Sequence, residues 1–331
     1  MGRSGRGVAG GSRDPGLRRA LGETSGYLGG NGDGATMTSE RRQLERAAPR
    51  LRNAPMRLRQ WRDLLASDGV ASIESKAGAL VLAMRDGQLN MHYGFHELEE
   101  TRRTFEALFD RLKPRLQSFR ADYARIDLVQ LPDRTWVEQL LYNVGFRSFG
   151  EWIEMEQPEL DPQAPPPEVP EGIRLRRATP EDSARIVEIE ADAHGGLGDG
   201  DAATRERIAG AGWVGVLEEQ GELAGYAINA PVADGEGRVL SVAVDPEWWG
   251  EGYGQLLLRA ATYQLAASGA RRAVVRARPE IPQALKTAQA AGYSVGLRGI
   301  EWRRLTDEAA VAARWERERQ VGVKARFGNW R

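Results

Sequence analysis

The segment with the clearest chemical meaning in this 331-residue sequence is a glycine run between an apolar strand and an apolar helix. Residues 241–255 read Ser-Val-Ala-Val-Asp-Pro-Glu-Trp-Trp-Gly-Glu-Gly-Tyr-Gly-Gln. Glycines at 250, 252 and 254 let backbone N–H groups approach a ligand without a Cβ in the way. The first turn of the next helix adds unpaired N–H donors and a dipole that favours negative charge. The pattern therefore predicts a phosphate or pyrophosphate site.

Two common phosphate-binding motifs do not fit this loop. A Walker loop needs Lys-Ser or Lys-Thr after its last glycine, and none follows Gly254. The dinucleotide fingerprint has another glycine spacing, and Pro246 stands between strand and loop. A glycine turn that serves only packing remains the alternative.

The elements around the loop alternate between strands and helices. Thr179-Pro-Glu-Asp182 offers an N-cap, a first-turn proline and early acids for a helix through Asp192. Glu219-Gln-Gly221 predicts the turn of a hairpin. Strands are expected at 173–177, 213–217, 223–229, 239–244, 273–277 and 293–305, with helices at 252–267 and 282–291. This order predicts a mixed α/β fold.

Composition divides the chain into five parts. Residues 1–55 form a Gly/Arg-rich arm with almost no apolar pattern, which predicts disorder. Six prolines in Pro158–Gly172 predict a stiff linker, set at 159–171. The linker separates a first domain, 56–158, from a second, 172–305, and a partly helical tail follows at 306–331.

The two domains share a repeat in ungapped register. In both, an apolar strand, a proline, a helix, a Gly-aromatic pair and a last strand follow in the same order. Pro132, Gly145, Phe146, Ile153 and Glu154 return 147 residues later as Pro279, Gly292, Tyr293, Ile300 and Glu301. A hairpin precedes this order in each domain, around Asp86-Gly87 in the first. The repeat predicts two copies of one fold.

The second domain resembles the GNAT N-acetyltransferase superfamily. Val244-Asp-Pro246 and Gly250-Glu-Gly252-Tyr-Gly254 match its signature between the fourth strand and third helix, without a gap. The resemblance implies two tandem domains, each a mixed sheet flanked by helices, and acetyl-CoA as co-substrate. Trp249 stands where the family usually has Arg or Gln. The implied cofactor-binding residues are Val242, Ala243, Val244, Trp249, Gly250, Glu251, Gly252, Tyr253, Gly254 and Gln255.

The first domain resembles a degenerate copy. Its equivalent strand passes from Phe95 straight into His96-Glu-Leu-Glu-Glu100, with no glycine loop and three acids that would repel pyrophosphate. We therefore expect no coenzyme A there. His92 and His96 span a strand-to-helix change, so no metal site is expected. The domain order is similar to that of mycothiol synthase, a likeness that leaves the acceptor open.

The usual catalytic groups of the family are missing. Leu240 and Ser241 stand where a strand Glu commonly acts as base, and Ala288 stands where a Tyr commonly acts as acid. The sequence offers five substitutes and assigns a role to none of them: Glu190, Asp192, His194, Tyr226 and Glu301.

Composition further reduces the number of possible function classes. Zero cysteines exclude disulfides and cysteine nucleophiles, and a net charge of -1 gives no general attraction to nucleic acid or membrane. We expect a cytoplasmic bacterial N-acetyltransferase that acts on a primary amine of a small molecule or peptide, in an unknown oligomeric state. A non-catalytic acyl-CoA sensor or scaffold is the alternative. The basic arm at 1–55 raises a third possibility, a nucleic-acid tether, against which an ordinary solvated tail is favoured.

Overall fold

The computed structural model describes residues 49, 51–54, 56, 58–67, 69–129, 135–194, 197–198 and 200–327, with side chains to residue 319 except that of Leu58. The first half contains β1 (Leu51–Arg52), α2 (Leu58–Ala66), β2 (Ala71–Glu74), β3 (Gly78–Arg85), β4 (Gln88–Phe95), α3 (Leu98–Leu116), β5 (Tyr123–Val129), α4 (Thr135–Asn143) and β6 (Arg147–Gln157). The second contains β7 (Ile173–Arg177), α5 (Ser183–His194), α6 (Asp201–Ala209), β8 (Trp213–Glu219), β9 (Glu222–Asn229), β10 (Glu236–Val244), α7 (Tyr253–Ala267), β11 (Arg272–Ala277), α8 (Pro282–Ala290), β12 (Ser294–Leu305) and α9 (Glu308–Phe327).

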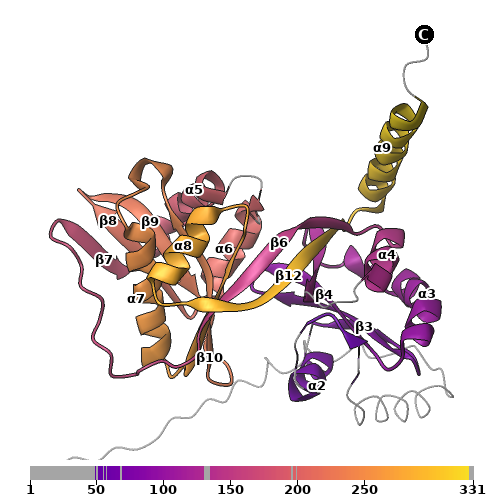
Figure 1. Ribbon diagram of the computed structural model, residues 1–331, viewed down its shortest axis with the longest axis horizontal. Helices are drawn as coiled ribbons and strands as arrows, with labels where there is room; N and C mark the ends of the chain where they lie inside the picture. Colours follow the sequence, from indigo (N-terminus) through magenta and orange to yellow (C-terminus); the bar gives the residue numbers. More distant parts are fainter. Residues whose placement is uncertain are drawn as a thin grey trace, which may run out of the picture. The chain divides into compact units, whose positions relative to one another are not determined.

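The strands of the described chain join into one twelve-stranded mixed sheet, shown in Figure 1. Their order is β2-β3-β4-β5-β12-β6-β11-β10-β9-β8-β7, and β1 pairs with β4. Helices lie on both faces of the sheet. The predicted mixed α/β fold is confirmed.

The last strand of each half pairs with the other half. β12 pairs with β5, as in Ile300 with Leu128, and β6 pairs with β11, as in Ile153 with Ala277. β6 and β12 also pair with each other. The sequence predicted a sheet for each half, and this strand exchange makes the two sheets continuous. Apolar residues of β6, among them Trp152, Ile153 and Met155, are buried, but the residue types of a strand do not by themselves specify which strand lies alongside.

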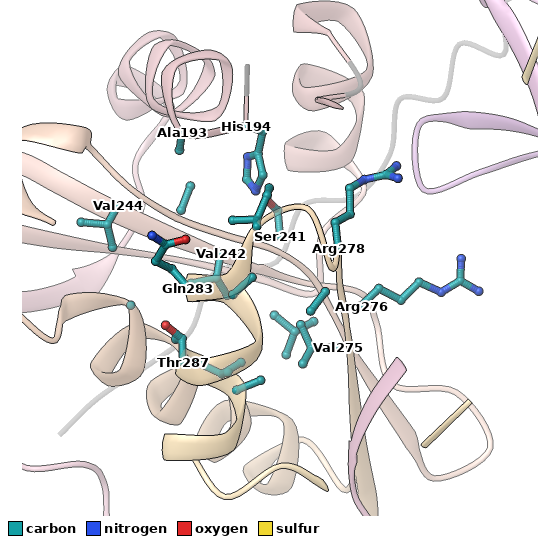
Figure 2. A pocket seen from close by; sticks show the side chains of 18 of the residues that line it. Ala193, His194, Ser241, Val242, Val244, Val275, Arg276, Arg278, Gln283 and Thr287 are labelled. Carbon is teal, nitrogen blue, oxygen red and sulfur yellow. The ribbon is translucent and has the colours of Figure 1, made fainter. Parts of the chain in front are cut away.

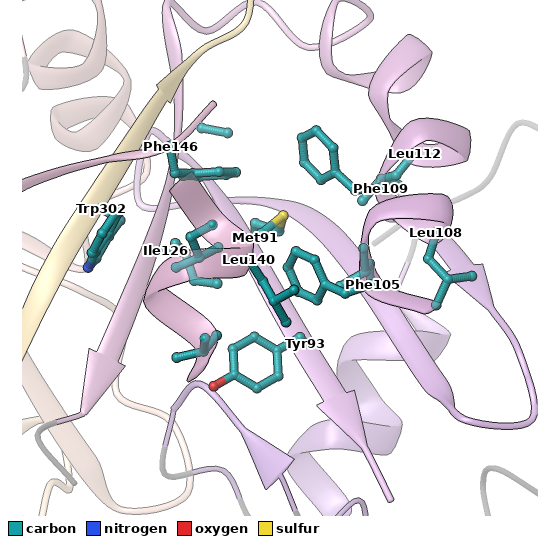
Figure 3. Close-up of a cluster of buried hydrophobic side chains, with 14 of the residues drawn as sticks. Met91, Tyr93, Phe105, Leu108, Phe109, Leu112, Ile126, Leu140, Phe146 and Trp302 are labelled. Carbon is teal, nitrogen blue, oxygen red and sulfur yellow. The ribbon is translucent and has the colours of Figure 1, made fainter. Parts of the chain in front are cut away.

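The hydrophobic cores follow the same exchange. Figure 3 shows the first-half core, a cluster of buried side chains that contains Trp302 of β12 together with Phe109, Ile126 and Phe146. In return, Ile153 and Met155 of β6 belong to the second-half core around α7. Each half therefore buries apolar side chains supplied by the other.

The repeat has a structural counterpart. β4-α3-β5-α4-β6 and β10-α7-β11-α8-β12 follow the same order, and a parallel pair flanks the first helix in each. Gly145 and Gly292 end α4 and α8 with φ of 94° and 95°, a left-handed conformation that favours glycine. The next residue's N–H bonds to the helix in both copies, Phe146 to Leu141 O at 2.9 Å and Tyr293 to Ala288 O at 3.0 Å. Pro132 lies outside the described residues.

Some boundaries of the predicted segments differ from the secondary structure of the chain. The disordered arm was expected to reach residue 55, but Leu51–Arg52 forms β1 against Gly94–Phe95, because an exposed strand edge there accepts a short partner. Residues 1–48 lie outside the described residues. Residues 159–171, all described, form neither helix nor strand. Among the described helices, none has the length and apolar character needed to cross a membrane.

Candidate functional site

A cavity of about 690 Å³ lies beside the glycine loop. Its walls come from β10, the loop itself, α7, β11 and α8, and the end of α5 closes one side; Figure 2 shows part of this lining. Asp86, Gln88 and Arg125 of the first half line it too. A cavity of this size is typical of small-molecule and cofactor sites.

The two faces of strand β10 pack against different clusters of side chains. Val242 and Val244 pack against the cluster that contains α7, whereas Ala243 belongs to the cluster formed with α5. A register shift between Val239 and Ser241 marks a bulge at Leu240. Bulges bend a strand and re-aim its side chains, and they are common beside functional sites. Ser241 is directed to the α5 face, where its hydroxyl contacts Glu190.

The parallel ladder between β10 and β11 ends early. It runs from Glu236–Arg272 to Val239–Val275 and stops there. Beyond that point Val242 still pairs with Ala227 of β9 on its other side. The later residues of β10 therefore border the cavity with a backbone edge that β11 does not cover.

The loop after β10 is shaped by its own residues. Asp245 caps a 3₁₀ turn, Pro246–Trp248, by accepting the Glu247 N–H at 2.9 Å. Gly250 and Gly252 have φ of 102° and 81°, and α7 begins directly after Gly252. Apart from the residues next to it in the chain, no heavy atom of the described chain lies within 4 Å of the place that a Cβ would take at either glycine. The loop therefore leaves open space in front of the α7 N-terminus, which suits an anionic ligand.

Nine of the ten predicted cofactor-binding residues line this cavity, and Glu251 does not. Tyr253 is 7% exposed and contributes its side chain to the core. Gln255 donates from its side chain to Ala290 O at 2.7 Å, which ties α7 to α8. The nine are Val242, Ala243, Val244, Trp249, Gly250, Gly252, Tyr253, Gly254 and Gln255.

Trp249 has a contact that the sequence did not suggest. Its indole N–H donates to Val244 O at 2.8 Å, while the residue stays 56% exposed. The ring is thus fixed at the end of β10, with its surface beside the glycine loop. A carbonyl oxygen has two lone pairs, so Val244 can still accept a second hydrogen bond.

A buried polar cluster lies on the α5 face of β10. Glu190, 5% exposed, accepts hydrogen bonds from the Tyr226 hydroxyl and, at 2.8 Å, from the Ser241 hydroxyl. Arg207 Nη1 lies 3.5 Å from Glu190 Oε1, and His194 Nδ1 lies 3.1 Å from Oε2. Three of the five predicted substitutes, Glu190, His194 and Tyr226, therefore meet in one place.

The charge of Glu190 is stabilised by these neighbours. Burial alone would raise its pKa, but His194, the Tyr226 hydroxyl and Arg207 together lower the pKa to about 2. Glu190 is therefore ionised at neutral pH. The pKa of Tyr226 is raised, first by burial and then by the Glu190 charge, so its hydroxyl stays protonated and donates.

A family model for GNAT acetyltransferases matches residues 183–293. This segment contains the cavity loop, β10, α7 and the Glu190 cluster. Residues 183–293 form a GNAT domain. The match supports acyl-CoA-dependent acetyl transfer in general.

Solved structures give the same fold for a larger part of the chain. A GNAT from Sphaerobacter thermophilus is 20% identical, with 75% of this chain and 84% of that chain covered and a TM-score of 0.51. A GNAT from Kribbella flavida is 16% identical, with 83% and 96% covered and a TM-score of 0.52. A tandem GNAT protein of the clavulanic acid pathway has the same identity and coverage and a TM-score of 0.53. Among curated proteins, none matches this chain.

In this GNAT domain, other residues occupy the positions where the family usually has its catalytic Glu and Tyr. Ala288 is buried in the core, so it leaves no polar group at the position expected for an acid. Ser241 has no carboxylate of its own but contacts that of Glu190. Asp192 is exposed and does not line the cavity. Glu301 does line it, but Arg278 binds it at 2.7 Å.

Arg207 is a site residue that sequence reasoning missed. It is 4% exposed on α6, yet it is one of two arginines there and has no distinguishing spacing. Only its burial beside Glu190 sets it apart.

Proposed function

We propose that this chain transfers an acetyl group from acetyl-CoA to a primary amine on a small molecule or peptide. The observation that carries the proposal is the open space in front of Gly250 and Gly252, at the N-terminus of α7 and at one end of the cavity. Acetyl-CoA supplies an activated thioester when bound. Both the loop and the uncovered β10 edge fit the parts of that molecule.

The chain would hold the coenzyme with two kinds of backbone group. The edge of β10 at Val242, Ala243 and Val244 offers N–H and C=O groups beyond the end of the β11 ladder, suited to the amides of the pantetheine arm. The loop from Trp249 to Gly254, with Gln255 after it, offers N–H groups to the pyrophosphate. Glu251, which lies outside the cavity lining, would take part through its backbone alone.

The acceptor would approach from the part of the cavity next to the first half. Arg125, Glu154, Arg276 and Arg278 are among the lining residues of the cavity, so charges of both signs are present in it. Positioning beside the thioester alone can supply much of the acceleration.

The first half would contribute walls rather than a second coenzyme site. Its β4 leads to α3 through His96 and Glu97, and Glu99 and Glu100 lie in the first turn of α3. Carboxylates at a helix N-terminus occupy the position that favours anions.

Calorimetry with acetyl-CoA, followed by free-thiol release in the presence of primary amines, tests the proposal. We expect saturable binding below the millimolar range, and thiol release that depends on one class of amine. Absence of binding at millimolar acetyl-CoA would contradict the proposed function.

An acyl-CoA sensor or scaffold is the second candidate, favoured by the absence of the usual Glu and Tyr at Ser241 and Ala288. A sensor would bind acetyl-CoA and release thiol at the background rate with every amine. Amine-dependent turnover that Gly252→Glu abolishes would exclude it.

A further inference from the structure

His194 ends α5 at the wall of the cavity, beside Ser241, as Figure 2 shows. A quarter of its side chain is exposed, in contrast to the almost fully buried Glu190 and Arg207. It is thus the member of the polar cluster with the greatest access to a ligand in the cavity.

The neighbours of His194 determine which ring nitrogen carries the proton. Nδ1 lies 3.1 Å from Glu190 Oε2 and 3.3 Å from the Glu190 carbonyl oxygen. Both oxygens accept hydrogen bonds, because Glu190 is ionised and a carbonyl has no proton. The Nδ1 position is therefore protonated, and the lone pair of the neutral ring is on Nε2, at the opposite side of the imidazole.

We propose that His194 is the general base of the acetyl transfer and that Glu190 is the residue that positions it; this inference rests on the proposed function. The amine nitrogen would attack the thioester carbonyl carbon, so that an N–C bond forms and the C–S bond breaks. The nitrogen, which becomes positively charged as the N–C bond forms, gives a proton to His194 Nε2, and the imidazolium then gives that proton to the leaving sulfur, which becomes the thiol. Nδ1 meanwhile remains bonded to the Glu190 carboxylate, which stabilises the imidazolium.

Glu190 is poorly suited to be the base itself. Its carboxylate already accepts from Tyr226, Ser241 and His194, and Arg207 lies beside it. A carboxylate that these donors stabilise binds another proton weakly. It orients the imidazole instead, as carboxylates do in many His-dependent sites.

The charged and titratable groups around His194 come from several elements. Glu190 is on α5 itself, Arg207 on α6 and Tyr226 on β9. Arg238 of β10 and Arg278, the residue directly after β11, line the same cavity. A pH profile of the rate must therefore be compared between variants that change one group at a time.

The first test compares His194→Gln with the matched variant His96→Gln, which changes a histidine outside the cavity. The amine that the wild-type protein acetylates fastest, chosen from spermidine, tyramine, glucosamine and an alanyl peptide, serves as acceptor. We expect His194→Gln to lower kcat by roughly 10²–10³-fold, to leave the acetyl-CoA Kd within twofold and to remove the rise of rate with pH. His96→Gln should change none of these. Added imidazole should restore part of the rate to His194→Ala.

The second test needs no acceptor. Only three histidines are present, so ¹⁵N-histidine spectra resolve each ring, and His194→Gln assigns one. We expect the Nδ1–H tautomer for His194 in the wild-type protein and a mixture of tautomers in Glu190→Gln. In the acceptor assay of the first test, Glu190→Gln should lower kcat by about tenfold.

The outcomes separate the two proposals. Wild-type protein that binds no acetyl-CoA contradicts the proposed function. Wild-type kcat in His194→Gln, or an Nε2–H tautomer in the native protein, overturns the role of His194 while leaving acetyl transfer intact.

Discussion

The Ser241 hydroxyl of β10 lies 2.8 Å from the carboxylate of Glu190, which comes from α5, 51 residues earlier in the chain. The pair puts a buried negative charge beneath the strand that borders the cavity. Tyr226 of β9 completes the contact, with its hydroxyl 3.1 Å from Ser241 Oγ. Three elements of the GNAT domain are thereby joined by one carboxylate.

The charge of Glu190 should make stability depend on pH. Its folded-state pKa of about 2 lies below the ordinary 4.5, so the ionised group stabilises the fold above about pH 4.5 and this is lost as pH falls toward 2. We expect Glu190→Gln to lower the free energy of unfolding by about 1–3 kcal/mol at pH 7 and by less at pH 3. Urea unfolding of the wild-type protein and the variant at pH 7 and at pH 3 measures these free energies. A difference that stays constant with pH would contradict it.

Gly252→Glu should abolish acetyl-CoA binding. The new side chain enters the open space at the α7 N-terminus and brings a carboxylate to the place of the ligand's phosphates. Because Gly252 has φ of 81°, the substitution should also cost about 1–2 kcal/mol of stability. Gly172→Glu is a matched control, with φ of 85°, the same open surroundings and a place outside the cavity. Thermal unfolding should show equal destabilisation of the two variants. Calorimetry should show that only Gly252→Glu loses acetyl-CoA binding.

Trp249→Arg should strengthen acetyl-CoA binding. The substitution removes the hydrogen bond to Val244 O and adds a positive charge beside the loop. We expect the Kd to fall by roughly 3–10-fold at low salt, an advantage that declines as salt screens the exposed charge. Trp249→Gln, which removes the ring without adding charge, is the control. An effect that does not depend on salt would assign the change to the lost ring.

Neither half should be stable by itself. A fragment of residues 172–331 would lack β6, which supplies the neighbour of β11 and the buried Ile153 and Met155. We expect this fragment to aggregate alone and to be rescued by co-expression with residues 1–171, as judged by gel filtration. A protease cut at an engineered site within 162–168 should leave the two pieces associated. A monomeric, folded 172–331 fragment would contradict the importance of the strand exchange.

Local features of this protein were predictable from sequence because they depend on neighbouring residues. The glycine loop at 250–254 and the capping box of Thr179 and Asp182 each follow from residue types within a few positions. The hairpin around Gln220-Gly221 follows in the same way, since both residues adopt positive φ. The resemblance to the GNAT family rests on such local features.

Only the tertiary structure decided two matters that involve distant residues. Apolar residues in β6 and β12 indicate burial, but the choice of partner strand depends on how the whole sheet closes, so the strand exchange between the halves could not be predicted from the sequence. Likewise Glu190, His194 and Ser241 are ordinary residues on a helix and a strand until α5 packs on β10. The sequence alone therefore determined the glycine loop that we propose binds a coenzyme, whereas packing decided which side chains lie beside it, because burial and proximity are properties of the folded chain.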